Sequence, residues 1–178
     1  MNDMAVRNDY GTLSDPTTLM IRRVLPGPIE RIWSYLTDSE LRAKWLASGD
    51  MRLAAGESFE LTWRNDRLAD GPATPRPEGF GEEHSMKSRI VEVEPPRRLV
   101  FTWGEQAEVT FTLIEKGSEV ILTVTHRRVA DRAVLLMVSA GWHAHLDVLA
   151  AVVAGKPRPD FWARWAHLKT EYETLLPA

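Results

Sequence analysis

The sequence contains no cysteine in its 178 residues. This absence excludes a disulfide framework, a thiolate nucleophile and a metal site built from cysteine ligands. It also fits a reducing compartment, so we expect a cytoplasmic location.

Excess positive charge and long apolar runs are lacking as well. The 22 lysines and arginines are outnumbered by 25 aspartates and glutamates, which gives a formal net charge of -3. Nucleic-acid-binding domains carry a basic stripe, so no nucleic-acid partner is expected. No run approaches the roughly 18 apolar residues of a membrane span, and residues 1–15 lack the apolar stretch of a signal peptide. We therefore expect no membrane partner.

Signatures of catalysis and of cofactor binding are also missing. The sequence has no nucleophile elbow, no phosphate-cradling glycine loop and no dinucleotide fingerprint. Its five histidines do not have metal-ligand spacing. His143 and His145 are two residues apart on an expected helix, hence about 200 degrees apart around its axis, and cannot bind one metal together. No metal, no cofactor and no catalytic residue is assigned.

What is present is a series of local signals in one order. Apolar residues alternate with polar ones in the strand segments and recur at helical spacing in the helix segments. The expected elements, in chain order, are a strand at 18–24, short helices at 29–36 and 39–46, strands at 59–64, 86–93, 99–103, 109–113 and 120–126, a long helix at 131–155 and a last helix at 160–176. This order predicts an α+β fold in which an antiparallel sheet curves around the long helix.

Turn and cap residues mark several of these boundaries. Glu115–Ser118 reads as a tight turn with glycine at a position of positive φ. Asp131 is suited to cap the long helix, and Gly155 followed by Pro157 ends it. Asp38 or Ser39 caps the second short helix. The polar residues 1–17 are expected to form a flexible tail, 18–155 the domain and 156–178 a helical extension.

The segment 66–81 is expected to be an irregular loop. It contains three prolines and three glycines, which interrupt any regular structure. A loop of this length in a compact domain is usually either functional or disordered.

Four stretches carry a resemblance to a known family. They are PIERIWSYLTDSELRAKWL, VEVEPPRRLVFTW, VTFTLIEKGSEVILTVTHRR and the GW of SAGWHAHLDVLAAVVAG. Over roughly residues 18–155 the chain resembles the START-like (SRPBCC) helix-grip superfamily, which includes the Bet v allergens and polyketide cyclases. Within it the chain is most similar to bacterial stand-alone members of the family named after the activator of the heat-shock-protein-ninety ATPase. The resemblance implies a helix-grip fold with a hydrophobic cavity between sheet and long helix.

Three features depart from that family. Trp45 and Leu46 stand where members often have paired tryptophans, the loop 66–81 is longer than the usual connection, and the last helix occurs in only some members. The co-chaperone that names the family has an additional N-terminal domain that helps to bind the chaperone, and residues 1–17 are too few to form it. Chaperone binding is therefore possible but not the favoured function.

The candidate ligand site is defined by apolar faces and two histidines. Seven tryptophans are unusual for this length, and aromatic walls suit a flat apolar ligand. The predicted ligand-binding residues are Trp33, Trp45, Trp63, Phe101, Trp103, Phe111, His126, Val138, Trp142 and His145. The alternative is that these side chains only pack the core.

If the cavity is an active site, only three residues are candidates for acid–base chemistry. His126 ends the apolar phase of its strand, His145 lies beside the apolar stripe of the long helix, and Glu83 follows the irregular loop. The alternative for His126 is a partly exposed side chain at a strand end. For His145 it is a polar group that is satisfied at the edge of the helix interface, and for Glu83 a solvated carboxylate.

The favoured function is binding of a small hydrophobic molecule. The alternatives are a cyclase- or hydratase-type enzyme acting on an apolar substrate and a module that activates a chaperone ATPase. Aromatic residues of the last helix suit either a homodimer contact or packing on the same chain, and both remain open.

Overall fold

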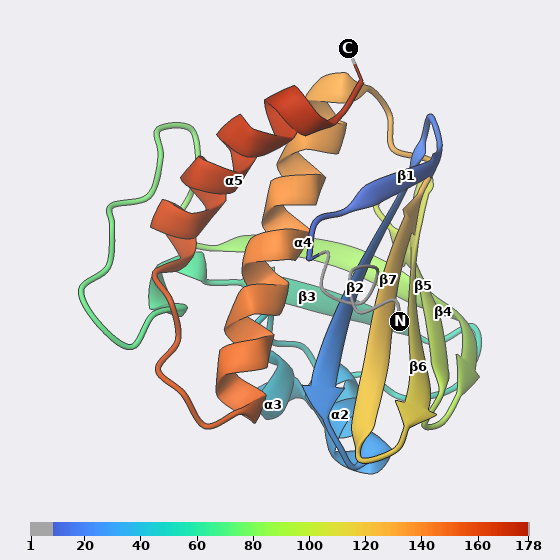
Figure 1. The fold of residues 1–178 in the computed structure, drawn as a ribbon. Coiled ribbons are helices and arrows are strands. Elements are labelled where there is room, and N and C mark those ends of the chain that lie inside the picture. Colours follow the sequence, from blue (N-terminus) through green and yellow to red (C-terminus); the bar gives the residue numbers. More distant parts are fainter. Residues whose placement is uncertain (1–8, 178) are drawn as a thin grey trace.

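Seven strands form one antiparallel sheet in the computed structural model, which describes residues 9–177 (Figure 1). The strands are β1 (Thr12–Asp15), β2 (Thr18–Pro26), β3 (Ser58–Trp63), β4 (His84–Glu94), β5 (Arg98–Trp103), β6 (Ala107–Lys116) and β7 (Glu119–Arg127). Their order across the sheet is β1-β2-β7-β6-β5-β4-β3. The predicted α+β helix-grip fold is confirmed.

The hairpin of β6 and β7 has the turn and the alternation that the sequence indicates. Gly117 in the turn has a φ of 62°, which a side chain would disfavour. Phe111 pairs with Val124 and Leu113 with Leu122, and all four side chains are buried on the inner face of the sheet. The hairpin thus provides the centre of the sheet surface on which the helices pack.

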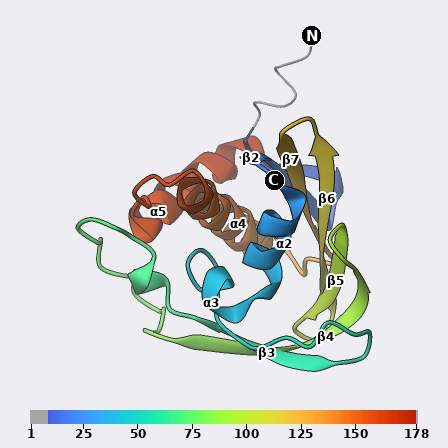
Figure 2. The same cartoon turned by 90° about the horizontal axis from the view of Figure 1, so that it is seen from below.

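The helices lie on the concave side of the sheet (Figure 2). They are α2 (Ile29–Thr37), α3 (Ser39–Arg42), α4 (Arg132–Val153) and α5 (Phe161–Leu175), with a short 3-10 helix η1 (Asn65–Arg67) after β3. The long helix α4 runs along the sheet, α2 and α3 lie beside it within the curve, and α5 lies on the far side of α4 from β6 and β7.

The ends of α4 match the expected signals. The Asp131 carboxylate accepts a hydrogen bond of 2.9 Å from the backbone N–H of Val134, and Gly155 beyond the last turn has a φ of 69°. By length and composition α4 could cross a membrane, but most of it is buried against the sheet and α5. It is the core helix of this fold.

The second short helix is shorter than expected because a buried arginine organises the turn that follows it. Arg42 is 1% exposed and its guanidinium donates to the carbonyl oxygens of Leu36 (3.3 Å), Thr37 (3.2 Å), Ala47 (3.1 Å) and Gly49. Burial lowers the pKa of Arg42 to about 10, so the group stays protonated at neutral pH. One side chain therefore joins the ends of α2 and α3 to the segment that leads to β3.

The expectation of a flexible tail over residues 1–17 is wrong for its described part. Residues 1–8 lie outside the described residues, but Thr12–Asp15 form β1 and pair with β2. The backbone N–H of Gly11 donates to the hydroxyl of Tyr172 over 2.7 Å. The segment is polar and short, so its strand forms only because β2 and α5 supply partners distant in sequence.

The last helix packs on its own chain. Its aromatic and apolar residues lie in the same hydrophobic core as residues 18–155, and the buried ones are Phe161, Trp162, Trp165, Leu168 and Tyr172. The aromatic surface that suggested a homodimer is therefore used within the protomer, and dimerisation remains a prediction without that argument.

Replacing Arg42 with methionine should destabilise the protein by about 3 kcal/mol, because four carbonyl oxygens, two in buried and two in partly buried hydrogen bonds, lose a donor. The measurement is urea unfolding at neutral pH. Arg52→Met is the matched control, since the side chain of Arg52 is 83% exposed. If the two variants have equal free energies of unfolding, the hydrogen bonds of the Arg42 guanidinium do not contribute to the stability of the protein.

Candidate functional site

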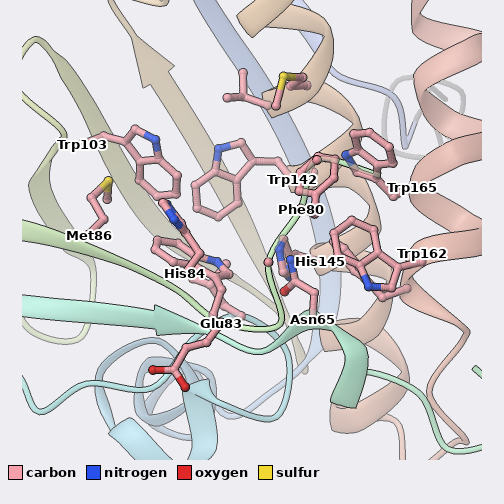
Figure 3. A pocket seen from close by; sticks show the side chains of 18 residues that line it. Asn65, Phe80, Glu83, His84, Met86, Trp103, Trp142, His145, Trp162 and Trp165 are labelled. Atoms are coloured by element: carbon pink, nitrogen blue, oxygen red, sulfur yellow. The ribbon is translucent and has the colours of Figure 1, made fainter. Parts of the chain in front are cut away.

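A cavity of about 400 Å³ lies between α4, α5 and the β3–β5 edge of the sheet (Figure 3). Indole rings from four elements border it: Trp63 of β3, Trp103 of β5, Trp142 of α4, and Trp162 and Trp165 of α5. The cavity is partly open to solvent, and residues 79–81 and Glu83 also border it. Its walls are mostly apolar, which is typical of small-molecule sites.

The structure brings half of the predicted ligand-binding residues to this cavity. Trp63, Trp103, Val138, Trp142 and His145 border it. Their contact with a ligand remains a prediction.

The other five lie in the core away from the cavity, and they are Trp33, Trp45, Phe101, Phe111 and His126. Trp45 illustrates the reason. Its indole is fully buried, lies 6.4 Å from the ring of Phe111 and donates to the carbonyl oxygen of Tyr35 over 2.8 Å. The helices α2 and α3 fill that part of the concave face, so side chains there pack the core.

Sequence reasoning missed the residues that complete the cavity. Trp162 and Trp165 are aromatic residues of the last helix, Phe80 belongs to the loop expected to be irregular, and Asn65 belongs to η1. No local pattern places these segments at one cavity, because Trp162 and Trp165 reach it only through the docking of α5, and Phe80 lies there against these two indoles.

The indole rings on the sheet side form a continuous aromatic wall. The ring of Trp103 lies 5.4 Å from Trp63 and 5.3 Å from Trp142, both in tilted or edge-on arrangements. Such geometries are favourable for aromatic pairs and hold each ring in a defined orientation. The wall therefore presents a preformed surface to the cavity.

His126 supports this wall from behind. The indole Nε1–H of Trp142 donates to His126 Nδ1 over 3.0 Å, and His126 is 1% exposed. Burial lowers the pKa of His126 to about 4, so the ring is neutral at pH 7 and can accept this hydrogen bond. The alternative of a partly exposed histidine at the strand end is wrong, because α4 covers the end of β7.

His145 both borders the cavity and has a backbone partner. Its Nδ1 lies 2.8 Å from the carbonyl oxygen of Trp45, and its ring centroid lies 4.4 Å from that of Phe161. Burial lowers the pKa of His145 to about 4. A carbonyl oxygen can only accept, so Nδ1 carries the proton and Nε2 of the neutral ring is an acceptor.

Glu83 lies at the rim and faces away from the aromatic cluster in Figure 3. Its carboxylate is 55% exposed and forms an ion pair of 3.2 Å with Arg64. This is the solvated arrangement that the sequence analysis gave as the alternative to acid–base chemistry.

The proline-rich loop is attached to α5 and closes one side of the cavity. The ring of Phe80 lies 5.0 Å from Trp162 and 5.3 Å from Trp165. Trp162 Nε1–H donates to the Asp66 carboxylate over 2.8 Å, and the Arg158 guanidinium pairs with Asp70 at 3.0 Å. The loop is therefore an ordered wall of the site.

No group of three or more potential metal ligands occurs among residues 9–177. The polar groups of the cavity include the amide of Asn65, the imidazoles of His84 and His145, and the carboxylate of Glu83. They are suited to orient an organic ligand by hydrogen bonds.

The sequence profile of the family described as activator of Hsp90 ATPase homolog 1-like protein matches residues 26–154. The chain belongs to this family. The predicted membership is confirmed, and its extent agrees with the resemblance seen over roughly residues 18–155. A comparison with proteins of curated function gave no match.

Solved bacterial structures share the fold of this family member. A Bordetella parapertussis protein is 39% identical over 97% of this chain and 93% of its own, with a TM-score of 0.80. CalU16 from Micromonospora echinospora is 24% identical over 90% of this chain and 89% of its own, with a TM-score of 0.67. DynU16, from the dynemicin biosynthetic locus, is 23% identical over 82% of this chain and 51% of its own, with a TM-score of 0.62. The last two similarities establish the fold alone.

Three buried histidines should make the protein sensitive to acid. The pKa values of His126, His143 and His145 are lowered to about 4, mainly by burial, against about 6.5 in the unfolded chain. Below pH 6.5 the unfolded state therefore binds more protons than the folded state, and the free energy of unfolding falls as the pH drops towards 4. At pH 5 each histidine should account for a loss of about 2 kcal/mol.

Urea unfolding between pH 7 and pH 5 measures this loss. His145→Gln should reduce the pH-dependent loss, because one titrating group is removed while an amide donor to the Trp45 carbonyl remains. His167→Gln is the control, since the His167 side chain is 65% exposed. If wild type and His145→Gln lose stability in parallel, burial of His145 does not control the effect.

Loss of the Phe80 ring should loosen the proline-rich loop. Phe80→Ala removes the contacts with Trp162 and Trp165, and a loss of about 1 kcal/mol would raise the open population about fivefold. Cleavage after the exposed Glu78 by a glutamate-specific protease reports this opening. Arg76→Ala, which removes only an exposed ion pair with Asp66, should be cleaved at nearly the wild-type rate. Equal rates for both variants would argue against the aromatic attachment.

Proposed function

We propose that the protein binds a small hydrophobic molecule in the cavity between the sheet, α4 and α5. The observation that carries this proposal is the convergence of five tryptophans from four elements on one cavity of about 400 Å³. That volume lies in the range of small-molecule sites, roughly 300–1,000 Å³. The cysteine-free composition supports a cytoplasmic location for this binding.

Gly141 supports the proposal independently. It lies inside α4 and borders the cavity, yet a Cβ atom added there would meet no atom within 4 Å. Glycine inside a helix costs about 1 kcal/mol relative to alanine. Neither a close packing contact nor a left-handed φ accounts for glycine here. The open space in front of Gly141 is consistent with room for a ligand.

Binding is favoured over catalysis by the state of the three acid–base candidates. His126 lies behind the aromatic wall, and Glu83 is exposed and paired with Arg64. His145 borders the cavity, but a pKa of about 4 makes it a weak base at pH 7. DynU16 comes from a biosynthetic locus, so turnover of any bound molecule should be measured beside its binding.

Chaperone binding remains a separate alternative, since the family is named after an activator of the Hsp90 ATPase. Stimulation of that ATPase by the purified protein tests it directly. A stimulation that survives the cavity-filling substitution described next would favour a protein-interaction role over ligand binding.

Filling the cavity from Gly141 should abolish ligand binding without unfolding the protein. Gly141→Leu places a branched side chain in the open space, whereas Gly141→Ala should stabilise the fold by about 0.5–1 kcal/mol. The uncharged fluorescent probe N-phenyl-1-naphthylamine reports binding, and we expect its affinity to fall about tenfold or more in Gly141→Leu. The control is Ala133→Leu on the exposed surface of the same helix. Unchanged probe affinity in Gly141→Leu would contradict binding in this cavity.

A further inference from the structure

The polar groups of the cavity are unevenly distributed. In Figure 3, Asn65 and His145 lie between the indoles of Trp103 and Trp142 on one side and the ring of Trp162 on the other. Both border the cavity, and one comes from η1 and the other from α4. These two side chains add polar atoms to a cavity whose other polar side chains include His84 and Glu83.

The side-chain oxygen of Asn65 has no hydrogen-bond partner among residues 9–177, although the atom is buried. Its backbone is held in place, because the Asn65 carbonyl accepts from the N–H of Leu68 over 3.1 Å. A buried polar atom without a partner is unfavourable and is usually satisfied by protein, water or ligand. The described chain therefore leaves the acceptor oxygen of the Asn65 side chain unused.

His145 adds a second acceptor to the same region. Its Nδ1–H is used by the Trp45 carbonyl oxygen at 2.8 Å, so the remaining ring nitrogen, Nε2, has a lone pair to offer. A ligand group that complements Asn65 Oδ1 and His145 Nε2 must carry a hydrogen-bond donor.

Neither a lysine nor an arginine of the described residues borders the cavity to pair with an anionic ligand. The charged side chain at the rim is Glu83. Beside the acceptors Asn65 Oδ1 and His145 Nε2, a carboxylate would have no lysine or arginine as a counter-charge, which is unfavourable in a mostly apolar site. A hydroxyl group avoids this penalty. It donates to either acceptor and accepts from the Asn65 amide N–H, so it suits both orientations of that amide.

We infer that the ligand is an uncharged aromatic molecule with a hydroxyl group that hydrogen-bonds to Asn65. The inference rests on the proposed function, because it names the class of molecule that this cavity binds. The aromatic walls provide the affinity for the ring system, and Asn65 with His145 selects the hydroxylated, uncharged member of a series of similar shapes.

Three probes of one shape test the inference: 2-naphthol, 2-methoxynaphthalene and 2-naphthoate, titrated calorimetrically at pH 7. We expect 2-naphthol to bind about fivefold more tightly than its methyl ether, which has no O–H to donate. The anionic 2-naphthoate should bind about tenfold more weakly than 2-naphthol or worse.

Substitutions at Asn65 test whether this residue causes the preference for 2-naphthol over its methyl ether. Asn65→Leu should bind 2-naphthol and 2-methoxynaphthalene equally, with the affinity for the ether within about twofold of wild type. Asn65→Ala gives the same test with a smaller side chain. Gln106→Leu is the matched control, since it replaces an exposed amide in the β5–β6 turn and should keep the wild-type preference.

The outcomes separate this inference from the proposed function. Equal binding of 2-naphthol and its ether to wild type overturns the inference while the cavity remains a binding site. A preference that persists in both Asn65 variants overturns the role of Asn65. Failure of these probes and of N-phenyl-1-naphthylamine to bind overturns the proposed function, and the inference with it.

Discussion

The long helix α4 is apolar around most of its circumference, and this constraint determines how the other elements are arranged. A helix of this kind must be covered on more than one side. The sheet covers one side of α4, and α5 with the proline-rich loop covers another. The cavity arises where these two covering layers diverge, at the β3–β5 edge of the sheet. The site is therefore a consequence of how the core helix is buried.

Three histidines in or against α4 are neutral, and each has a specific partner. His126 accepts from the Trp142 indole, His143 Nδ1 lies 2.8 Å from the Tyr172 hydroxyl, and His145 donates to the Trp45 carbonyl. Each bond joins α4 to a different part of the chain. Together they fix the rotation of the helix about its axis, which decides that Trp142 and Gly141 border the cavity. At the cavity, by contrast, the side-chain oxygen of Asn65 has no such partner within the described residues.

Much of the fold could be predicted from the sequence because the signals are local. Alternation and the Gly117 turn define the β6–β7 hairpin, and Asp131 and Gly155 delimit α4. The same reasoning missed β1, since a short polar segment has no pattern that indicates a strand. It also extended the second short helix too far, because the role of Arg42 depends on carbonyl groups that come together only in the folded chain.

The sequence by itself determined the order of the elements, the family and the presence of aromatic side chains on the sheet and on α4. Only the tertiary structure decided which of these side chains border the cavity. Trp103 and Trp142 meet there as expected, whereas Trp45 is buried beneath α2 and α3. Trp162 joins the site through the docking of α5, and Asn65 through the short helix η1 that follows β3. Periodicity reveals which face of an element is buried, but not which neighbour covers it, because that depends on packing between segments far apart in the chain.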